Sequence, residues 1–538
     1  MENKNTLIAL MLMMAIWFGY SLFFQSPPPP PQIPQQESVS AVPDSVPLPV
    51  SSTRDASSQQ VGTDTFSGLN QNVPVREITI ENDLYQAVFS TSGARLISFK
   101  LKNYRQTLDA EAPFISLVEP STFREGTLNT SGVDGIGFPV NAVYHVDFSQ
   151  DSLYLKDAEE LRLVFTFVRQ DGVRVDKTYI FHGNRYEFDL SLAVSNGSSQ
   201  LVRGSLSLSL INPLDETNKG DSLTFVGPVT LTTDELLTDK PQDIETEQRQ
   251  YSKNVIWSGF EDKYFISAVV PLDDTSEKVR IEKSGQNIYS HFDSRFISLE
   301  AGQSFFLNYI LYLGPRDLDV LKQAGHELFR AIDFGYFSLI AKPLLHVLKF
   351  FYSFIGNYGI AIIILTIIIK LLFWPLTHKS YASMKNMQKL QPQMQQIREK
   401  FKNNREKQNL EMMQLYKTHR VNPMGGCLPM LVQIPVFFAL YKVLLGAIEL
   451  RQAPFAFWIT DLSLKDPYYV TPLIMGATMF IQQKLTPSTM DPIQAKMFML
   501  MPIVFTFLFL NFPSGLVLYW LVNNLLTIIQ QYFIHKKA

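Results

Sequence analysis

Cysteine is almost missing from this chain, with one residue in 538. A single cysteine excludes an intramolecular disulfide framework and any cysteine-rich metal site. Charged residues are also scarce, at 18%, whereas 46% of residues are hydrophobic and 40 are Phe. Apolar runs such as 358–376 and 497–512 are too hydrophobic for a soluble domain of this charge content. The composition therefore predicts a multi-domain membrane protein with a large soluble portion, and not a cytosolic enzyme.

The charge is divided unevenly along the chain. Residues 341–538 hold 20 Lys+Arg and 7 Asp+Glu, whereas residues 1–340 hold 27 and 43. The overall net charge of −3 hides this division. Such asymmetry indicates that the two parts face different surroundings.

The first 25 residues predict a membrane anchor. Thr6–Phe24 is free of charge, and 19 helical residues just span a hydrocarbon core of about 30 Å. An uncleaved signal anchor is favoured over a cleaved signal peptide, which would have a shorter apolar run and a small-residue cleavage site. Lys4 favours a cytoplasmic N-terminus. Residues 26–72, rich in Pro, Ser and Gln, predict an extended periplasmic tether without a core.

Residues 73–330 predict an all-β periplasmic domain. Hydrophobic residues alternate with polar ones around Ile78 and Ile80, over 161–168 and over 205–210, and Asp171-Gly172 is a hairpin signal. Many short antiparallel strands are typical of a β-sandwich. No metal cluster, nucleophile motif or phosphate loop is visible in this part of the sequence. Its acidic residues indicate a solvated surface, and a glycosidase would need paired carboxylates that the sequence does not reveal.

Residues 331–353 predict an amphipathic helix in the membrane interface. Lys342, His346 and Lys349 fall on one helical face, and apolar residues fill most of the rest. The alternative is a buried helix of the soluble domain.

Residues 354–538 predict an α-helical core of five spans. The spans are expected at about 357–376, 427–446, 468–484, 496–512 and 515–534. The loop 377–427 carries ten Lys+Arg against three Glu, so the positive-inside rule places it in the cytoplasm. With the anchor, six spans put this loop and both termini inside the cell and the large domain in the periplasm.

A helical hairpin is expected at 378–424, with a turn near residues 402–405. Its basic residues suit either anionic lipid or a docking partner such as the RNA-rich surface of a ribosome.

Lys370 is the candidate functional residue, because it follows nine apolar or weakly polar residues within a predicted span. A charge there costs roughly 2.5–3.5 kcal/mol on insertion scales. Snorkelling toward the edge marked by Trp374 is the alternative. Other spans carry amides, including Gln433 and Asn523, which suit an inward-facing polar lining or hydrogen bonds between helices.

Five ordered motifs resemble those of the YidC membrane protein insertases, over about residues 335–534. The motifs are Lys370-Leu371-Leu372-Phe373-Trp374-Pro375-Leu376-Thr377, Val421-Asn422-Pro423-Met424-Gly425-Gly426-Cys427-Leu428-Pro429, Gln433-Ile434-Pro435-Val436-Phe437, Arg451-Gln452-Ala453-Pro454-Phe455 and Phe512-Pro513-Ser514-Gly515-Leu516-Val517-Leu518-Tyr519-Trp520. The anchor, tether and β domain are similar to the Gram-negative form, whose periplasmic domain is a β-supersandwich.

The resemblance implies insertion and folding of inner-membrane proteins, alone or with the Sec translocon, in a five-span bundle with a hydrophilic groove. It implies no catalytic residue and no cofactor. Nascent membrane proteins, the Sec translocon, the ribosome (through 378–424 and the basic C-terminal tail) and lipids are the implied partners. The implied groove residues are Lys370, Thr366, Gln433, Tyr519 and Trp520. Lys370 stands where the family pattern has Arg, which keeps the charge but loses the planar five-donor fork.

Two other functions compete with insertion. A transporter or channel would use Lys370 and the amides for a solute, but it predicts inverted repeats, and none is visible between 335–440 and 441–534. An anchored periplasmic sugar-binding protein would leave the basic cytoplasmic hairpin without a role.

Overall fold

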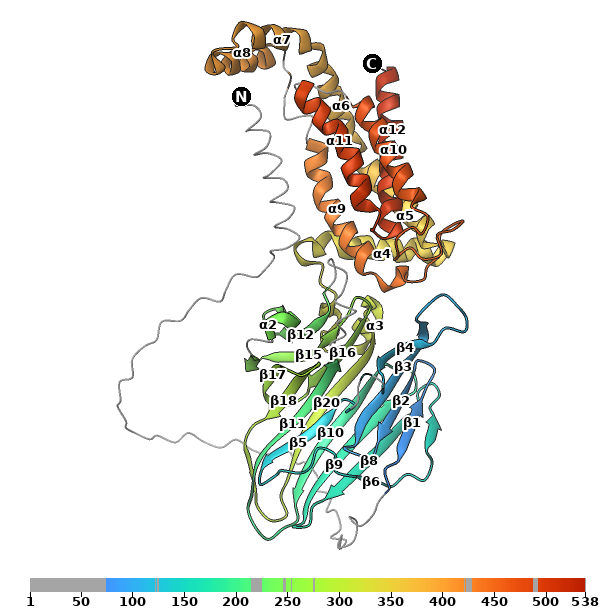
Figure 1. Ribbon diagram of the computed structural model, residues 1–538, viewed down its shortest axis with the longest axis vertical. Coiled ribbons are helices and arrows are strands. Elements are labelled where there is room, and N and C mark those ends of the chain that lie inside the picture. Colours follow the sequence, from blue (N-terminus) through green and yellow to red (C-terminus); the bar gives the residue numbers. More distant parts are fainter. Residues whose placement is uncertain are drawn as a thin grey trace, which may run out of the picture. The chain divides into compact units, whose positions relative to one another are not determined.

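A computed structural model describes residues 74–537. It leaves out residues 121, 123–124, 214–224, 245–247, 253, 274–275, 420, 422–427 and 487–491 within this range. The predicted anchor at 1–25 and tether at 26–72 lie outside the described residues. A β-rich part is followed by a helical part, as the sequence predicts (Figure 1).

The described residues of the β domain form three sheets. The first has the order β4 (Phe114–Val118), β3 (Arg95–Arg105), β2 (Tyr85–Ser90), β1 (Glu77–Glu81) and β7 (Ser152–Tyr154). The second has the order β13 (Leu236–Thr238), β12 (Gly227–Thr232), β15 (Val255–Glu261), β16 (Phe265–Pro271), β20 (Ser304–Pro315), β10 (Glu187–Asn196), β9 (Val173–His182), β8 (Glu160–Val168) and β6 (His145–Val146). The third has the order β14 (Arg249–Ser252), β17 (Ser276–Ser284), β18 (Asn287–Ser294), β11 (Val202–Pro213) and β19 (Ile297–Leu299), with β5 (Asn129–Asp134) also paired to β11.

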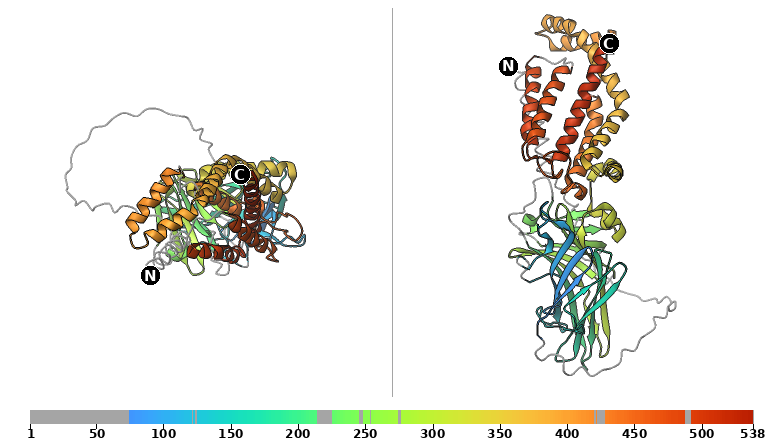
Figure 2. Two further views of the ribbon diagram at one scale, coloured as in Figure 1. Left: turned by 90° about the horizontal axis from the view of Figure 1, so that it is seen from above. Right: turned by 90° about the vertical axis from the view of Figure 1, so that its right-hand side faces the viewer.

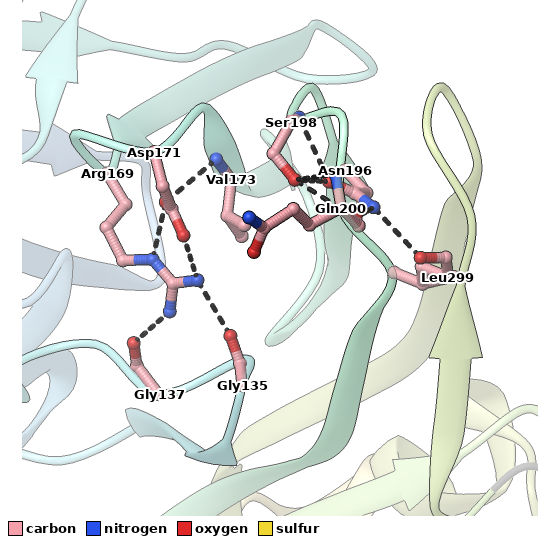
Figure 3. A network of polar contacts seen from close by, with 9 residues as sticks. All are labelled: Gly135, Gly137, Arg169, Asp171, Val173, Asn196, Ser198, Gln200 and Leu299. Carbon is pink, nitrogen blue, oxygen red and sulfur yellow. Dashed lines mark hydrogen bonds and ion pairs between the residues drawn. The ribbon is translucent and has the colours of Figure 1, made fainter.

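The predicted hairpin at Asp171-Gly172 is confirmed between β8 and β9. Gly172 has φ +93°, and a Cβ there would lie 3.1 Å from the Gly197 backbone, so the turn requires glycine. Arg169 fixes the turn by pairing with Asp171 and donating to the carbonyls of Gly135 and Gly137 (Figure 3). The adjacent turn is held by Asn196, whose amide donates to the carbonyls of Gln200 and Leu299 (Figure 3).

The alternating strands bury one continuous apolar core. Phe89 lies among Tyr179, Phe181 and Phe188, with ring centroids 4.7–6.4 Å apart. Lys177 is fully buried in the same region, and its ammonium donates to the carbonyls of Leu128 at 2.8 Å and Gly93 at 3.3 Å. Burial lowers the pKa of Lys177 to about 7.

The helical part follows β20. Its elements are α3 (Leu318–Ala324), η1 (Leu328–Ala331), η2 (Gly335–Phe337), α4 (Ser338–Ile355), α5 (Tyr358–Leu372), α6 (Trp374–Lys389), α7 (Gln391–Lys400), α8 (Arg405–Thr418), α9 (Leu428–Gly446), η4 (Ile448–Leu450), α10 (Val470–Leu485), α11 (Pro492–Phe509) and α12 (Ser514–Lys537). A further short helix, α2 (Pro241–Ile244), belongs to the β domain. α12 packs most closely against α10 and α5, and α4 packs across the ends of α5 and α9 (Figures 1 and 2).

Among the described residues, two helical segments are long and apolar enough to cross a membrane, Gly335–Ile355 and Ser514–Ile534. The pair α5 and α6 passes the same test together, although a bend of 60° separates the two helices. Val432–Gly446 and Met499–Phe509 are shorter apolar segments. The number of core spans therefore stays a prediction.

Ion pairs hold α4 to α3 and η4 within the helical part. The Lys349 ammonium of α4 lies 3.3 Å from Asp317 and 3.1 Å from Glu449, and it also pairs with Asp319. Asp317 begins α3 as its N-cap, whereas Glu449 follows α9. Arg451, which follows η4, joins the helical part to the β domain by donating to the carbonyl of Arg105 in β3.

Candidate functional site

The α5 helix carries the candidate cation into the bundle. Its N-terminus is capped by Asn357, whose side chain accepts from the Ile360 amide at 3.1 Å, and β-branched and leucine side chains fill the following turns. Its last turn places Lys370 on the inner face, where the residue is only 8% exposed. By contrast, Leu371 and Leu372 are more than half exposed and face outward.

Two neutral oxygens of α12 hold the Lys370 ammonium. It donates to the Thr527 hydroxyl at 2.6 Å and to the Asn523 side-chain oxygen at 3.3 Å. The Thr527 hydroxyl in turn donates to the Asn523 backbone carbonyl at 2.6 Å, which fixes it as an acceptor for the lysine. Within the part of the chain that the structure describes, Lys370 forms no ion pair. Its charge is therefore hydrogen-bonded but not neutralised.

A small recess opens beside this ammonium. It is lined by Ile369, Lys370, Phe373, Leu376, Thr377, Gln433 and Asn523. Its free volume of about 10 Å³ holds about one water molecule. Gln433 of α9 closes one side, because its amide donates to Asn523 at 3.0 Å. Three helices thus meet at one polar point that can receive a hydrogen-bonding group.

The polar side chains of α12 continue beyond this recess. Gln530 donates to Thr377 of α6 at 2.6 Å. Gln531 donates to Tyr381 of α6 at 3.0 Å and to Thr486, just after α10, at 2.9 Å. The side-chain oxygens of both glutamines are buried without a partner among the described residues. The polar face of α12 therefore retains unused hydrogen-bonding capacity.

Of the five predicted site residues, Lys370 and Gln433 line the recess, and Tyr519 contacts Gln433 from α12. Thr366 lies one helical turn before Lys370, but its hydroxyl donates to the Ile362 carbonyl of its own helix. Tyr519 is buried at 1% exposure, one turn before Asn523. The Trp520 ring packs against Phe437 and Phe509. The last three residues do not line the recess.

Asn523 and Thr527 hold the cation, and neither was among the predicted site residues. Asn523 is visible in the sequence as an amide within a span, whereas threonine is common in apolar helices and gives little signal. The spacing of Asn523, Thr527 and Gln530/Gln531 by about one turn was the available signal.

The basic loop after α6 folds back on itself. α7 and α8 lie side by side, and Met387, Leu390 and Met394 form their small buried core with Tyr416 against it (Figure 1). Leu410 and Met413 of α8 are exposed by 63% and 56%. This hairpin presents cations and a few apolar side chains together.

Two family models match this chain. The model described as "60Kd inner membrane protein" matches residues 350–538, and the model described as "YidC periplasmic domain" matches residues 77–347. Proteins named membrane protein insertase YidC from Geotalea uraniireducens and Geotalea daltonii are each 48% identical over 99% of this chain and 99% of their own. A solved structure described as an active YidC insertase with its first transmembrane domain resolved covers 85% of this chain and 92% of its own, at 19% identity and a TM-score of 0.36.

Proposed function

Because this chain belongs to the YidC family of membrane protein insertases, we propose that it inserts proteins into the bacterial inner membrane by receiving their polar ends at Lys370. The work is non-covalent, so it needs neither a catalytic residue nor a cofactor. The driving free energy comes from burial of the substrate's apolar segment in lipid.

The observation that carries this proposal is a buried, unneutralised ammonium beside a polar recess. Unsatisfied polar groups cost several kcal/mol each in hydrocarbon. Lys370, Asn523 and Gln433 offer hydrogen-bonding partners inside the bundle. The cation in addition favours carboxylates over neutral groups. A substrate tail with acidic residues therefore crosses the bilayer at a lower free-energy cost through this site.

The recess must widen to receive a peptide, because it now holds about one water molecule. The Gln433–Asn523 hydrogen bond bridges α9 and α12 across it. We propose that an incoming polar tail replaces this bond with its own donors and acceptors, and that α9 and α12 separate into a hydrophilic groove. Thr366, Tyr519 and Trp520 then line the deeper part of this groove.

The apolar segment leaves sideways. On α5, Ile367, Ile368, Leu371 and Leu372 are exposed by 37–72%, next to the inward-facing Lys370. A hydrophobic helix can pack on this surface while its polar tail remains at the recess. Lipid then replaces the α5 contact without exposing either apolar surface to water.

The remaining partners follow from charge and topology. We propose that the α6–α8 region, within 378–424, and the basic C-terminal tail face the cytoplasm and bind the ribosome, since they carry clustered cations that suit RNA phosphates. The β domain lies in the periplasm, and both termini are cytoplasmic. The protein acts alone on short substrates and with the Sec translocon on larger ones.

Reconstitution tests the proposal directly. Purified full-length protein in liposomes should promote insertion of a one-span substrate, measured by protection of its translocated tail from protease. A photocrosslinker at Gln433 should react with a stalled nascent chain, whereas the same group at exposed Ala301 of the β domain should not. Solute flux without insertion would favour a transporter instead.

A further inference from the structure

The loop between η4 and α10, residues 451–469, presents apolar side chains outward. We call it the rim loop. Phe457 is 93% exposed, Tyr468 68% and Leu464 60%. The Trp458 ring lies between two of these side chains, with centroids 5.9 Å from Phe457 and 6.4 Å from Tyr468. An outward aromatic group of this kind marks an interaction surface.

The rim loop is firmly held by hydrogen bonds. The Asp466 carboxylate accepts from the Trp458 indole at 3.0 Å, the Tyr468 amide at 2.9 Å and both the amide and hydroxyl of Thr471 at 2.7 Å. These bonds bind the loop to the start of α10. These hydrogen bonds fix the backbone of the rim loop, and the fixed backbone directs the apolar side chains outward.

The rim loop is also bound to two other helices. The Leu464 carbonyl accepts from the amide and hydroxyl of Ser514, at the start of α12. The Phe455 carbonyl accepts from the Asn357 side chain at the start of α5. The loop thus closes one end of the bundle, the end where Arg451 contacts the β domain.

Phe457 is held outward at an energetic cost. Its φ of +55° lies in the left-handed region, which is unfavourable for a residue with a side chain. In water this residue would combine backbone strain with a fully solvated phenyl ring. An apolar environment around the ring removes the second of these costs.

We propose that the rim loop lies in the interfacial layer of the leaflet on the β-domain side, with Phe457, Leu464 and Tyr468 in contact with phospholipid. Lipid is favoured over a protein partner by position, because the loop joins the ends of the apolar helices α9 and α10. Aromatic side chains prefer this layer. Non-helical backbone can enter this layer only where its polar groups are hydrogen-bonded. Backbone amides of the rim loop that donate within the protein are those of Ala453, Phe455, Ile459, Leu462, Ser463 and Tyr469.

Lys465 adds a cation to the same surface. Its ammonium lies 5.8 Å from the Tyr469 ring, and its side chain is exposed. Phosphate groups of lipids lie at the depth that this arrangement requires. The rim loop therefore sets the depth of the bundle in the bilayer, independently of substrate binding.

A site-specific fluorophore tests this placement. Cys427 is the only cysteine, so Cys427→Ser followed by Phe457→Cys permits a single environment-sensitive nitrobenzoxadiazole label on the full chain. In vesicles of phosphatidylethanolamine and phosphatidylglycerol, we expect blue-shifted emission, weak iodide quenching and stronger quenching by lipids with a nitroxide near the headgroup than near the chain end. The control is Ala301→Cys, in the exposed turn between β19 and β20, which should give water-like emission.

Water-like emission at position 457 in these vesicles would overturn the proposal and would point to a protein partner for the rim. Quenching strongest near the chain ends would also overturn it, since the loop would then lie in the hydrocarbon core. A second variant tests the role of Asp466. Asp466→Ala should raise iodide quenching at position 457 by releasing the loop, and an unchanged value would refute placement by this carboxylate.

Discussion

Replacing Lys370 with methionine should separate insertion from stability. The variant keeps most of the side-chain volume and removes the ammonium that Thr527 and Asn523 now accept from. We expect slower insertion of substrates with acidic translocated tails and unchanged insertion of substrates with neutral tails. The reason is that the cation distinguishes carboxylates from other polar groups by charge alone.

The size of the effect follows from the geometry. Two unit charges 4 Å apart interact by about 4 kcal/mol at an effective dielectric constant of about 20. This would correspond to nearly a thousandfold, since each 1.4 kcal/mol or so is tenfold in an equilibrium constant. The recess has room for about one water molecule, which weakens this interaction, so we expect about a tenfold to hundredfold loss for one carboxylate.

The free energy of unfolding should rise or stay the same in Lys370→Met, although insertion becomes slower. Lys370 has no ion-pair partner among the described residues, so its burial costs folding roughly 2.5–3.5 kcal/mol on insertion scales. Lys370→Met should therefore keep or raise the free energy of unfolding while it slows insertion.

The assay is insertion into liposomes of one-span substrates whose tails carry no, one or two aspartates, with Lys370→Arg as the charge-retaining control. The ratio of wild-type to Lys370→Met rates should rise with each added aspartate. Equal ratios for the neutral and acidic tails would refute the electrostatic argument, and lower stability of the variant would indicate a structural role for the lysine.

Three further predictions concern other residues. Thr527→Val should slow insertion of acidic tails several-fold, because it removes the hydroxyl that accepts from Lys370 at 2.6 Å. Thr478→Val is the control and should not slow insertion, since among the described contacts the Thr478 hydroxyl accepts only a 3.5 Å bond from α12. Similar insertion rates for both variants in the liposome assay would contradict this prediction. The pKa of Lys177 is about 7 in the folded state and about 10.4 in the unfolded state, so the unfolded state binds more protons between these two pH values. The free energy of unfolding should therefore rise between about pH 7 and 10.4. Chemical denaturation should show this rise in the wild type and not in Lys177→Met. Lys349→Met should lower the free energy of unfolding by about 2 kcal/mol, allowing for partial exposure of the lysine, because Glu449 stays buried without its cation. Adding Glu449→Gln to this variant should restore part of the lost free energy, measured by chemical denaturation.

The β-domain strands were predictable because their alternation is local. The pattern around Ile78 and Ile80 became β1, and the alternating Ser and Leu residues at 205–210 lie in β11. Their division among three sheets was not predictable. Pairing of β10 with β20, for example, joins residues more than a hundred positions apart, and the side chains at each strand carry little information about the partner.

The candidate site was predictable in part. Lys370 is conspicuous because a charge within an apolar run needs an explanation. The ammonium turns to Thr527 and Asn523 of α12, as an inward-facing polar lining requires. These partners could not be derived, because hydropathy finds spans without telling which faces meet. Thr366, Tyr519 and Trp520 came from the family resemblance, and their roles stay proposals.

The distribution of hydrogen bonds around α12 has a consequence for biosynthesis. Lys370, Thr377 and Gln433 all find their described α12 partners after residue 520, and α12 follows these three residues in the chain. During translation, the earlier helices emerge before the segment that completes their polar contacts. A nascent copy of this protein thus resembles the clients it serves, with amides and a cation awaiting partners in the bilayer, and the bundle can close only after α12 has been made.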